Sequence, residues 1–437
     1  MKQLKTPINI FWFRRDLRLD DNIGFYEALT SEHPVLPLFI FDTEILEDLP
    51  EDDARVTFIF DALQNMRTIL QKEHGSSLAL YQGKPLTIYK QLVKDYDVAA
   101  VFTNHDYEPY AQERDAEIKE FLSKNNIAFH SFKDQVIFEK NEVVKKDGDP
   151  YVVYTPYMKI WKEKFKTIDL KIFTTNSHLH NLVENTELPN LSLSDLGFKK
   201  ASQKIANYEL TPSLIQDYEK TRNFPAQDST SRLGPHLRFG TVSIRKMMKK
   251  AIAEKNEIFW QELIWREFFM QILWHFPHTA TESFKPKYDR IEWLNNEENF
   301  KRWCDGTTGY PLVDAGMRQL NATGFMHNRV RMLVGSFLCK HLLIDWRWGE
   351  AYFAEKLHDY EMASNVGNWQ WVAGCGVDAA PYFRIFNPTT QIEKFDKDLK
   401  YITTWVPEFQ ELSYPDKMVD HKEARLRCLE TYKRALE

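Results

Sequence analysis

The chain has 437 residues, of which 43% are hydrophobic and 27% charged, and it carries a formal net charge of −6. The length predicts two domains, and the composition is typical of a soluble globular protein. The net charge excludes a generally basic nucleic-acid binder, so any binding of that kind requires a local basic patch.

The cysteines and the first residues indicate where the protein resides. The four cysteines lack metal-ligand spacing and are too few for a disulfide framework, which favours reduced thiols: Cys304, Cys339, Cys375 and Cys428. The first apolar run, from Ile8 to Phe13, has six residues and is closed by charged ones. Such a run is too short for a signal peptide or a membrane span. We therefore expect a cytoplasmic protein without a membrane segment.

Up to residue 138, short β-rich runs alternate with helical stretches. Near-continuous apolar runs, as in strands buried on both faces, predict strands at 7–13, 34–42, 77–83, 98–104 and 127–132. Helical apolar spacing predicts helices over 53–74 and 111–126. This alternation predicts a Rossmann-like parallel sheet wrapped by helices. No G-x-G-x-x-G or G-x-x-x-x-G-K-[ST] pattern follows the first strand, so the signature of ordinary dinucleotide or nucleoside-triphosphate binding is missing.

The rest of the chain has a different character. A polar, strand-poor stretch predicts a connector over 139–205, and the pattern beyond it predicts an all-α domain over 206–437, after an α/β domain over 1–138. Ten of the twelve tryptophans lie between 260 and 405, and twelve arginines lie between Arg222 and Arg384. A large core with a charged surface accounts for each residue singly. The whole set indicates a direct role for indole and guanidinium groups.

The segment SNVGNWQWVAG, residues 364–374, places Trp369 and Trp371 two positions apart. On a helix, a separation of two residues turns the side chains by roughly 200°, so these indoles are expected on opposite faces. On a helix with a single buried face, apolar residues recur every three or four positions instead.

Three further segments contain candidate functional groups. Thr230, Ser231 and Arg232 stand where a helix is expected to begin, an arrangement that suits either an anion such as a diphosphate or a plain helix cap. In QELIWREFFMQIL, residues 261–273, Glu262 shares a helix face with Trp265 and Arg266. That face suits a planar polar ligand, or an amphipathic helix with an internal ion pair.

The third segment is TGFMHNRVRMLVGSF, residues 323–337. Its two arginines, Arg329 and Arg331, face different ways on a helix, so one is available for an inward pair and the other for a phosphate. Asp359 and Glu361 are the expected inward partners, and a solvated charged face is the alternative.

Several long motifs together resemble the photolyase/cryptochrome family: FWFRRDLRLDDN, TSRLGPHLRFGTVS, ELIWREFF, TGYPLVDAGMRQLNATGFMHNRVRM, DWRWGEAYF, NVGNWQW and DAAPYFRIFNPTTQ. The resemblance covers nearly the whole chain and is strongest from about 215 to 400. Within the family, the chain is most similar to bacterial class I photolyases that repair cyclobutane pyrimidine dimers (CPDs). The resemblance implies an α/β antenna domain, a connector and a helical domain that holds FAD.

The resemblance also implies an electron relay and a substrate pocket. Trp369, Trp346 and Trp293 match the family's relay, from the flavin outward. Trp371 and Trp265 match indoles that pack against the flipped dimer, and Glu262 matches the carboxyl that hydrogen-bonds it. Asn328 and Met332 match residues that line the same cavity.

Further positions match cofactor and DNA contacts. The expected FAD-binding residues are Tyr218, Thr230, Ser231, Arg232, Leu233, Gly234, Arg266, Arg331, Asp359, Glu361 and Asn365, the last opposite flavin N5. Gly234 stands where the family usually has Ser, and Glu361 where it commonly has Asp. The expected DNA contacts are Arg222, Glu262, Trp265, Arg266, Asn328, Arg329, Trp371, Arg384 and Gln391. No metal is expected.

The same comparison weighs other activities. The related (6-4) photolyases have histidines at the positions of Asn328 and Met332, whereas the nearest histidine here is His327. Signalling cryptochromes usually have a C-terminal extension, for which this sequence leaves little room. A light-independent flavin oxidoreductase requires a route for a second substrate, and a non-enzymatic DNA-binding module does not explain the tryptophans. CPD repair by a monomer acting on dimer-containing DNA is therefore the expected function.

The identity of any antenna chromophore stays open. Folate-binding relatives have an adjacent Asn-Glu where this chain has Tyr110 and Ala111, so that folate contact is missing. A deazaflavin, a flavin or no second chromophore are the remaining alternatives.

Overall fold

The computed structural model describes residues 4–437, which divide into two compact units. The first unit contains the residues up to Glu139 together with Thr167–Asn207 and Leu233–Lys250, and the second contains Lys140–Lys166, Tyr208–Arg232 and Ala251–Glu437. The chain therefore passes between the units several times. The predicted boundaries at residues 138 and 205 stay a prediction.

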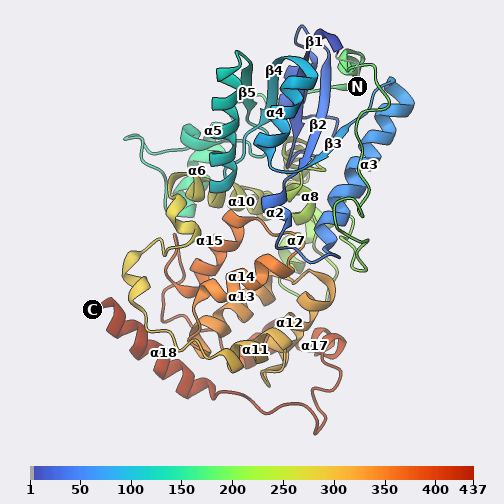
Figure 1. Cartoon of the computed structure of the whole chain (residues 1–437). Helices are drawn as coiled ribbons and strands as arrows, with labels where there is room; N and C mark the ends of the chain where they lie inside the picture. The colour runs from blue at the N-terminus through green and yellow to red at the C-terminus, as the bar shows by residue number, and fades with distance from the viewer. Residues whose placement is uncertain (1–3) are drawn as a thin grey trace. The chain divides into compact units, whose positions relative to one another are not determined.

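The first unit is built on a five-stranded parallel sheet with the order β3-β2-β1-β4-β5 (Figure 1). The strands are β1 (Leu4–Phe13), β2 (Val35–Phe41), β3 (Ala79–Gln82), β4 (Tyr96–Asn104) and β5 (Ala128–Phe132). All five predicted strands are confirmed, and so is the parallel α/β class. The prediction that each strand is buried on both faces is wrong for β5, whose residues are mostly exposed. It pairs only with β4 and forms an edge of the sheet.

Helices cover both faces of this sheet because alternate side chains of each strand point to opposite sides. Phe11 and Phe13 of β1 pack in one cluster with α1 and α3, while Ile10 and Trp12 pack in another with α4 and α5. The α-helices of this part of the chain are α1 (Ile23–Leu29), α2 (Thr43–Leu46), α3 (Ala54–His74), α4 (Pro85–Asp95), α5 (Pro109–Lys124), α8 (Gly234–Arg238) and α9 (Ile244–Ala253), with the 3-10 turn η2 (Asn176–Asn181).

A buried charge network joins distant segments of the first unit. Arg245, 5% exposed, pairs with Asp21 and with Asp134, which are 0% and 1% exposed, at 3.1 and 2.8 Å. Arg18 donates to the other carboxylate oxygen of Asp134 at 2.6 Å. Because an unpaired buried charge is costly, each of these segments requires the others in place.

The second unit is helical. Its elements are η1 (Lys140–Glu142), α6 (Tyr154–Phe165), α7 (Pro212–Thr221), α10 (Glu257–His275), η3 (Pro277–Ala280), η4 (Pro286–Arg290), α11 (Glu297–Asp305), α12 (Pro311–Thr323), α13 (Asn328–Ser336), the π-helical turn η5 (Phe337–His341), α14 (Trp346–Lys356), α15 (Met362–Ala373), α16 (Pro388–Phe395), α17 (Lys400–Trp405) and α18 (His421–Leu436). The predicted helical domain is thereby confirmed in class.

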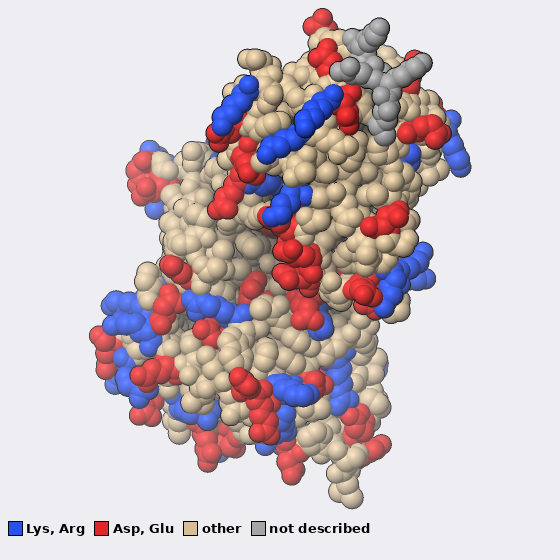
Figure 2. Space-filling model, viewed as in Figure 1, with Lys and Arg blue, Asp and Glu red and all other residues tan. Residues whose placement is uncertain are grey.

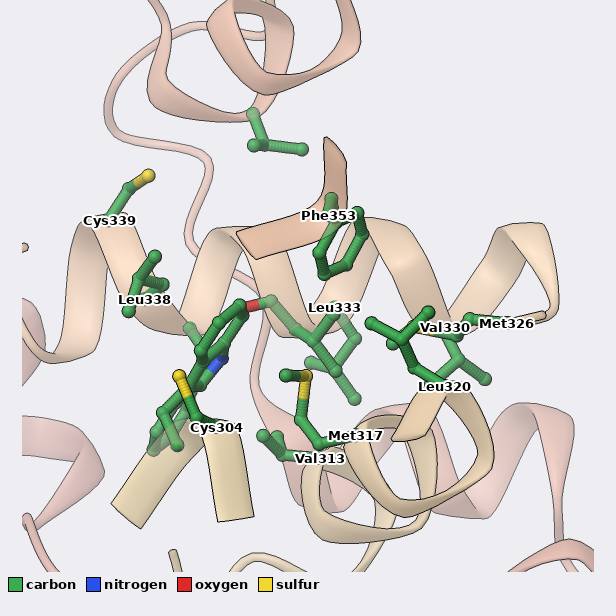
Figure 3. Close-up of a cluster of buried hydrophobic side chains, with 14 of the residues drawn as sticks. Cys304, Val313, Met317, Leu320, Met326, Val330, Leu333, Leu338, Cys339 and Phe353 are labelled. Atoms are coloured by element: carbon green, nitrogen blue, oxygen red, sulfur yellow. The ribbon is translucent and has the colours of Figure 1, made fainter. Parts of the chain in front are cut away.

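The core of the second unit lies between α11, α12, α13, α14 and α15. Figure 3 shows side chains from several of these elements converging, among them Met317 of α12, Leu333 of α13 and Phe353 of α14. Two glycines let α15 pack closely against its neighbours. A Cβ at Gly349 of α14 would come within 2.2 Å of the Trp369 ring, and one at Gly367 within 2.2 Å of Phe269 on α10.

Across the described range, residues 4–437, no helix is both long and apolar enough to span a membrane.

Candidate functional site

Helix α10 carries the candidate substrate residues. Nη1 of Arg222, which follows α7, lies 2.5 Å from Oε1 of Glu262. Burial raises the pKa of Glu262, and the Arg222 charge opposes that rise. Arg266, four residues after Glu262, instead pairs with the buried Glu361 at 3.0 Å. The ion pairs of both residues therefore connect α10 to other segments of the unit.

Three of the candidate DNA-contacting arginines lie close enough to influence one another. Burial lowers the pKa of Arg329, and the charges of Arg222 and Arg384 lower it further. Nη2 of Arg329 donates to Oδ1 of Asn223 at 2.6 Å, and its guanidinium lies 4.4 Å from the centre of the Phe395 ring. Arg384 is exposed. Arg222, Arg329 and Arg384 therefore form a local basic cluster on a protein of net negative charge.

The other candidate residues on this side vary in exposure. Asn328, the first residue of α13, is exposed, and Met332 is half-buried with its Sδ 3.7 Å from Nη1 of Arg329. Gln391 is half-buried on α16. Figure 2 shows acidic and basic side chains interspersed on the face it draws. The candidate arginines are therefore distinguished by their contacts and not by the charge of a whole face.

His327 lies within the protein. It is 3% exposed and is the N-cap of α13, where its Nδ1 accepts from the backbone N–H of Arg329 at 3.2 Å. Burial, reinforced by Arg331 and other arginines, lowers its pKa to about 4. His327 is therefore a neutral structural acceptor at physiological pH.

The predicted pair between Arg331 and Asp359 is present. Nη1 and Nη2 of Arg331 donate to the two carboxylate oxygens of Asp359 at 3.2 and 2.9 Å, a bidentate pair. Its Nε donates to the carbonyl of Met326 at 2.7 Å. Glu361 precedes α15 and also accepts from Ser364 at 3.0 Å. These contacts fix the planes of the guanidinium and the carboxylates.

Asn365 has a partner that sequence reasoning missed. Its amide nitrogen donates to Oε1 of Glu350 at 2.9 Å and to the Glu350 carbonyl at 3.1 Å. Burial raises the pKa of Glu350. The contact fixes the direction of the Asn365 amide. Glu350 lies in the quoted motif DWRWGEAYF but showed no pairing signal, because its partner lies on another helix.

The candidate diphosphate segment is an extended turn ahead of a short helix. Arg232 has a φ of +53°, a conformation that non-glycine residues seldom adopt and that often marks functional turns. Its guanidinium lies 3.6 Å from the centre of the Phe325 ring. The N-cap position of α8 is Leu233, which makes no side-chain cap hydrogen bond.

The remaining members of the predicted FAD-binding group lie on α7 and at the start of α8. The half-buried Tyr218 lies on α7, with its ring 5.0 Å from that of Phe259. Leu233, which is buried, and Gly234, which is exposed, fall in the first compact unit, whereas Thr230, Ser231 and Arg232 close a segment of the second.

The two tryptophans of the segment 364–374 differ in burial as their spacing predicts. Trp369 is 3% exposed and packs in the main core, whereas Trp371 is half-buried at its margin. Trp346, 1% exposed, belongs to the same cluster, and the half-buried Trp293 packs against it. Two of the three relay candidates are thus buried in the core, and the third is half-buried at its edge. Trp303, which was not singled out, has its ring 6.2 Å from that of Trp369.

Helix α6 lies within the stretch expected as a connector and contacts α10. Its Trp161 donates to the buried Glu267 at 2.5 Å, and Tyr157 donates to the same oxygen at 3.3 Å. Tyr154 stacks on Trp265 with ring centroids 3.5 Å apart. The apolar spacing of Tyr154, Tyr157 and Trp161 (i, i+3, i+7) was the signal by which this helix might have been predicted.

The fold and these contacts define a class of protein: a parallel α/β unit and a helical unit whose oriented arginine, carboxylate and amide groups suit an aromatic anionic cofactor. Residues 9–176 match the DNA photolyase family, and residues 259–434 match the FAD binding domain of DNA photolyase. The chain is 36% identical to the deoxyribodipyrimidine photo-lyase of Halobacterium salinarum, over 98% of this chain and 99% of the relative. The chain belongs to the DNA photolyase family.

Solved structures show the same similarity. A bacterial class III photolyase from Agrobacterium tumefaciens has a TM-score of 0.87 and 33% identity, over 99% of this chain and 98% of its own. The archaeal photolyase from Sulfolobus tokodaii, which holds two FAD molecules, has a TM-score of 0.82 and 33% identity, over 98% and 99%. These matches confirm the family resemblance and the fold class.

Proposed function

We propose that this protein is a DNA photolyase that uses light and FAD to repair cyclobutane pyrimidine dimers in DNA. The observation that carries the proposal is the placement of two indoles on α15, with Trp369 in the core among other tryptophans and Trp371 at its margin. One helix thereby serves both an electron relay and a stacking surface. The photo-lyase relatives support this activity.

The donors present fit FAD. Hydroxyls at Thr230 and Ser231 and the guanidinium of Arg232 suit its phosphates, with Tyr218, Leu233 and Gly234 as further contacts. The fixed pairs Arg331–Asp359 and Arg266–Glu361 and the amide of Asn365 suit the polar edge of a flavin ring. When bound, reduced FAD supplies the light-excited electron for ring opening.

The tryptophans supply electrons toward that site. Trp369, Trp346 and Trp293 form the relay, because indoles are oxidisable and these three extend from the buried core to a half-buried position. Asn365, oriented by Glu350, adjusts the electronic properties of the cofactor through its amide.

On the substrate side, Trp265 and Trp371 provide aromatic surfaces for the extruded bases. Glu262 hydrogen-bonds the dimer, while Asn328 and Met332 shape its cavity. Arg222, Arg329, Arg384 and Gln391 contact the DNA backbone. Because a damaged pair costs less to unpair than normal bases, this pocket selects the dimer.

We further propose that the protein acts as a monomer on DNA. A second chromophore is compatible with the Sulfolobus relative, whose structure contains two FAD molecules. Tyr110 and Ala111 do not supply the folate contact, so a flavin-type antenna is the better candidate. His327 caps α13 from within the protein, which argues against (6-4) repair by this histidine.

The test is to purify the protein, record its absorption spectrum, and illuminate the reduced enzyme with matched oligonucleotides containing a CPD or a (6-4) photoproduct. We expect a flavin spectrum and light-dependent loss of the CPD only. A purified protein that neither contains nor takes up FAD contradicts the proposal. Exclusive repair of the (6-4) oligonucleotide would show that the protein is a (6-4) photolyase instead.

A further inference from the structure

Tyr154 forms the closest aromatic stack described in the helical unit. Its ring lies parallel to that of Trp265, with centroids 3.5 Å apart and planes inclined by 9°. Tyr154 is 6% exposed, whereas Trp265 is half-buried. Aromatic pairs of this kind contribute beyond the area they bury, so the stack restrains the orientation of the indole.

Tyr154 is itself fixed at two points. Its hydroxyl donates to the Gln261 carbonyl of α10 at 2.9 Å, and its backbone N–H donates to the Asp378 carboxylate at 3.2 Å. Burial, followed by the charge of Glu262, raises the pKa of Tyr154 well above its usual value, so the hydroxyl remains a donor. The ring thus stands close to both Glu262 and Trp265 of α10.

Helix α6, which begins with Tyr154, is itself fixed against α10. Trp161 and Tyr157 donate to Glu267 of α10, which is 3% exposed. Lys162 pairs with Glu257 at the start of α10 at 2.7 Å. Since a buried carboxylate requires its partners, α6 cannot move along α10 without a large loss of stability.

We infer that Tyr154 is a positioning residue for substrate binding, which acts by holding the Trp265 indole in the plane that receives the dimer. The inference rests on the proposed function, because it assigns a dimer-stacking role to Trp265. It goes further by making α6 part of the recognition apparatus. An indole restrained before binding loses less rotamer freedom when the substrate stacks on it, so the gain appears as affinity.

The experiment compares Tyr154→Leu and Tyr154→Phe with the wild-type holoenzyme on a CPD-containing oligonucleotide. Tyr154→Leu is expected to raise the dissociation constant for the CPD oligonucleotide about 3- to 10-fold, the range of one aromatic stack. The quantum yield of repair at saturating substrate and the photoreduction of FAD are expected to remain at wild-type values. Tyr154→Phe keeps the ring, so it should restore most of the affinity.

Tyr310→Leu is the control, since Tyr310 is also a buried tyrosine but lies away from α6, at the start of α12, where its ring packs on Phe337 with centroids 5.0 Å apart. It should lower thermal stability without changing CPD affinity. A double-mutant cycle then separates positioning from general loosening. In a Trp265→Leu background, Tyr154→Leu should have almost no further effect on CPD affinity.

Three results overturn the inference: an unchanged dissociation constant for Tyr154→Leu, an equal loss of CPD affinity in Tyr310→Leu, or an effect of Tyr154→Leu that is just as large in the Trp265→Leu background. A wild-type enzyme that binds and repairs no CPD instead refutes the proposed function, so the two failures are distinguishable. If Tyr154→Leu does not fold, Tyr154→Phe is compared with Trp265→Leu instead. Equally weak CPD binding by these two variants would also refute the role of the ring, because Tyr154→Phe keeps it.

Discussion

The guanidinium of Arg222 and the carboxylate of Glu262 lie 2.5 Å apart, although both are candidates for contacts with DNA. Burial nevertheless raises the pKa of Glu262 above its usual value. When DNA phosphates draw Arg222 away, that pKa should rise further, because the opposing positive charge is lost. We therefore expect the Glu262 carboxyl to be protonated more readily when substrate is bound.

This relationship predicts the pH dependence of repair. A protonated carboxyl donates a hydrogen bond to a dimer carbonyl, so repair should be highest below the pKa of Glu262 and decline as the pH rises through it. Glu262→Gln keeps a donor without titrating and should give a nearly flat profile at reduced yield. Glu262→Leu should lower the quantum yield roughly tenfold or more. Yields measured from pH 5 to 9 check this, and a Gln variant with the wild-type decline contradicts it.

Arg384 should contribute a salt-dependent phosphate contact. Because it is exposed, Arg384→Gln should leave folding intact. It should weaken binding to damaged and undamaged DNA alike and reduce the slope of log K against log salt by about 1. Titrations between low and moderate salt measure that slope. Arg434→Gln on α18, whose partner is Glu292, is the control and should leave the slope unchanged.

The two indoles of α15 should have separable roles. Trp369→Phe should block photoreduction of oxidised FAD yet leave repair by chemically reduced enzyme nearly intact. Trp371→Phe should do the reverse, weakening CPD binding while photoreduction proceeds. Flash absorption and binding assays measure both properties. If either substitution impairs both equally, the division between the two faces of the helix is wrong.

His327 should make stability fall on acidification. Its pKa is about 4 in the folded protein, against about 6.5 for an unperturbed histidine. The unfolded chain therefore takes up the proton first, so the contribution to stability is complete above pH 6.5 and is lost as the pH falls toward 4. The loss between pH 7 and pH 5 is about 2 kcal/mol.

His327→Asn tests this, since Asn also accepts at a helix N-cap but does not titrate. Denaturant unfolding at several pH values should show a shallower acid dependence for this variant. Two curves that run parallel between pH 4 and 6.5 would exclude the histidine as a source of the dependence.

Much of the architecture was predictable from local patterns. The five strands and the helices α3 and α5 of the α/β unit follow from continuous apolar runs and helical spacing, and the opposite placement of Trp369 and Trp371 follows from helix geometry alone. Pairings between distant segments were not predictable this way. Glu262 and Arg266 have the spacing of an internal ion pair, yet their partners are Arg222 and Glu361, 40 and 95 residues away.

The same limit explains the other misses. The exposure of β5 depends on which strand ends the sheet, and sequence spacing does not define that order. The contact of Glu350 became evident only from the packing of α14 against α15, which places its carboxylate beside the Asn365 amide. The helix that carries Tyr154 was not predicted, because the segment 139–205 is mostly polar and the apolar stripe of this helix is short.

The Arg245 network has a consequence for the way this protein is made. Asp21 and Asp134 emerge from the ribosome long before Arg245, and each would remain a buried charge lacking this partner until translation has passed residue 245. The amino-terminal sheet therefore cannot reach its final stability while it is being synthesised. A fragment that ends at residue 205 would lack Arg245 and would be less stable for the same reason. Full stabilisation of this sheet depends on Arg245, which follows Asp134 by 111 residues and Asp21 by 224 residues.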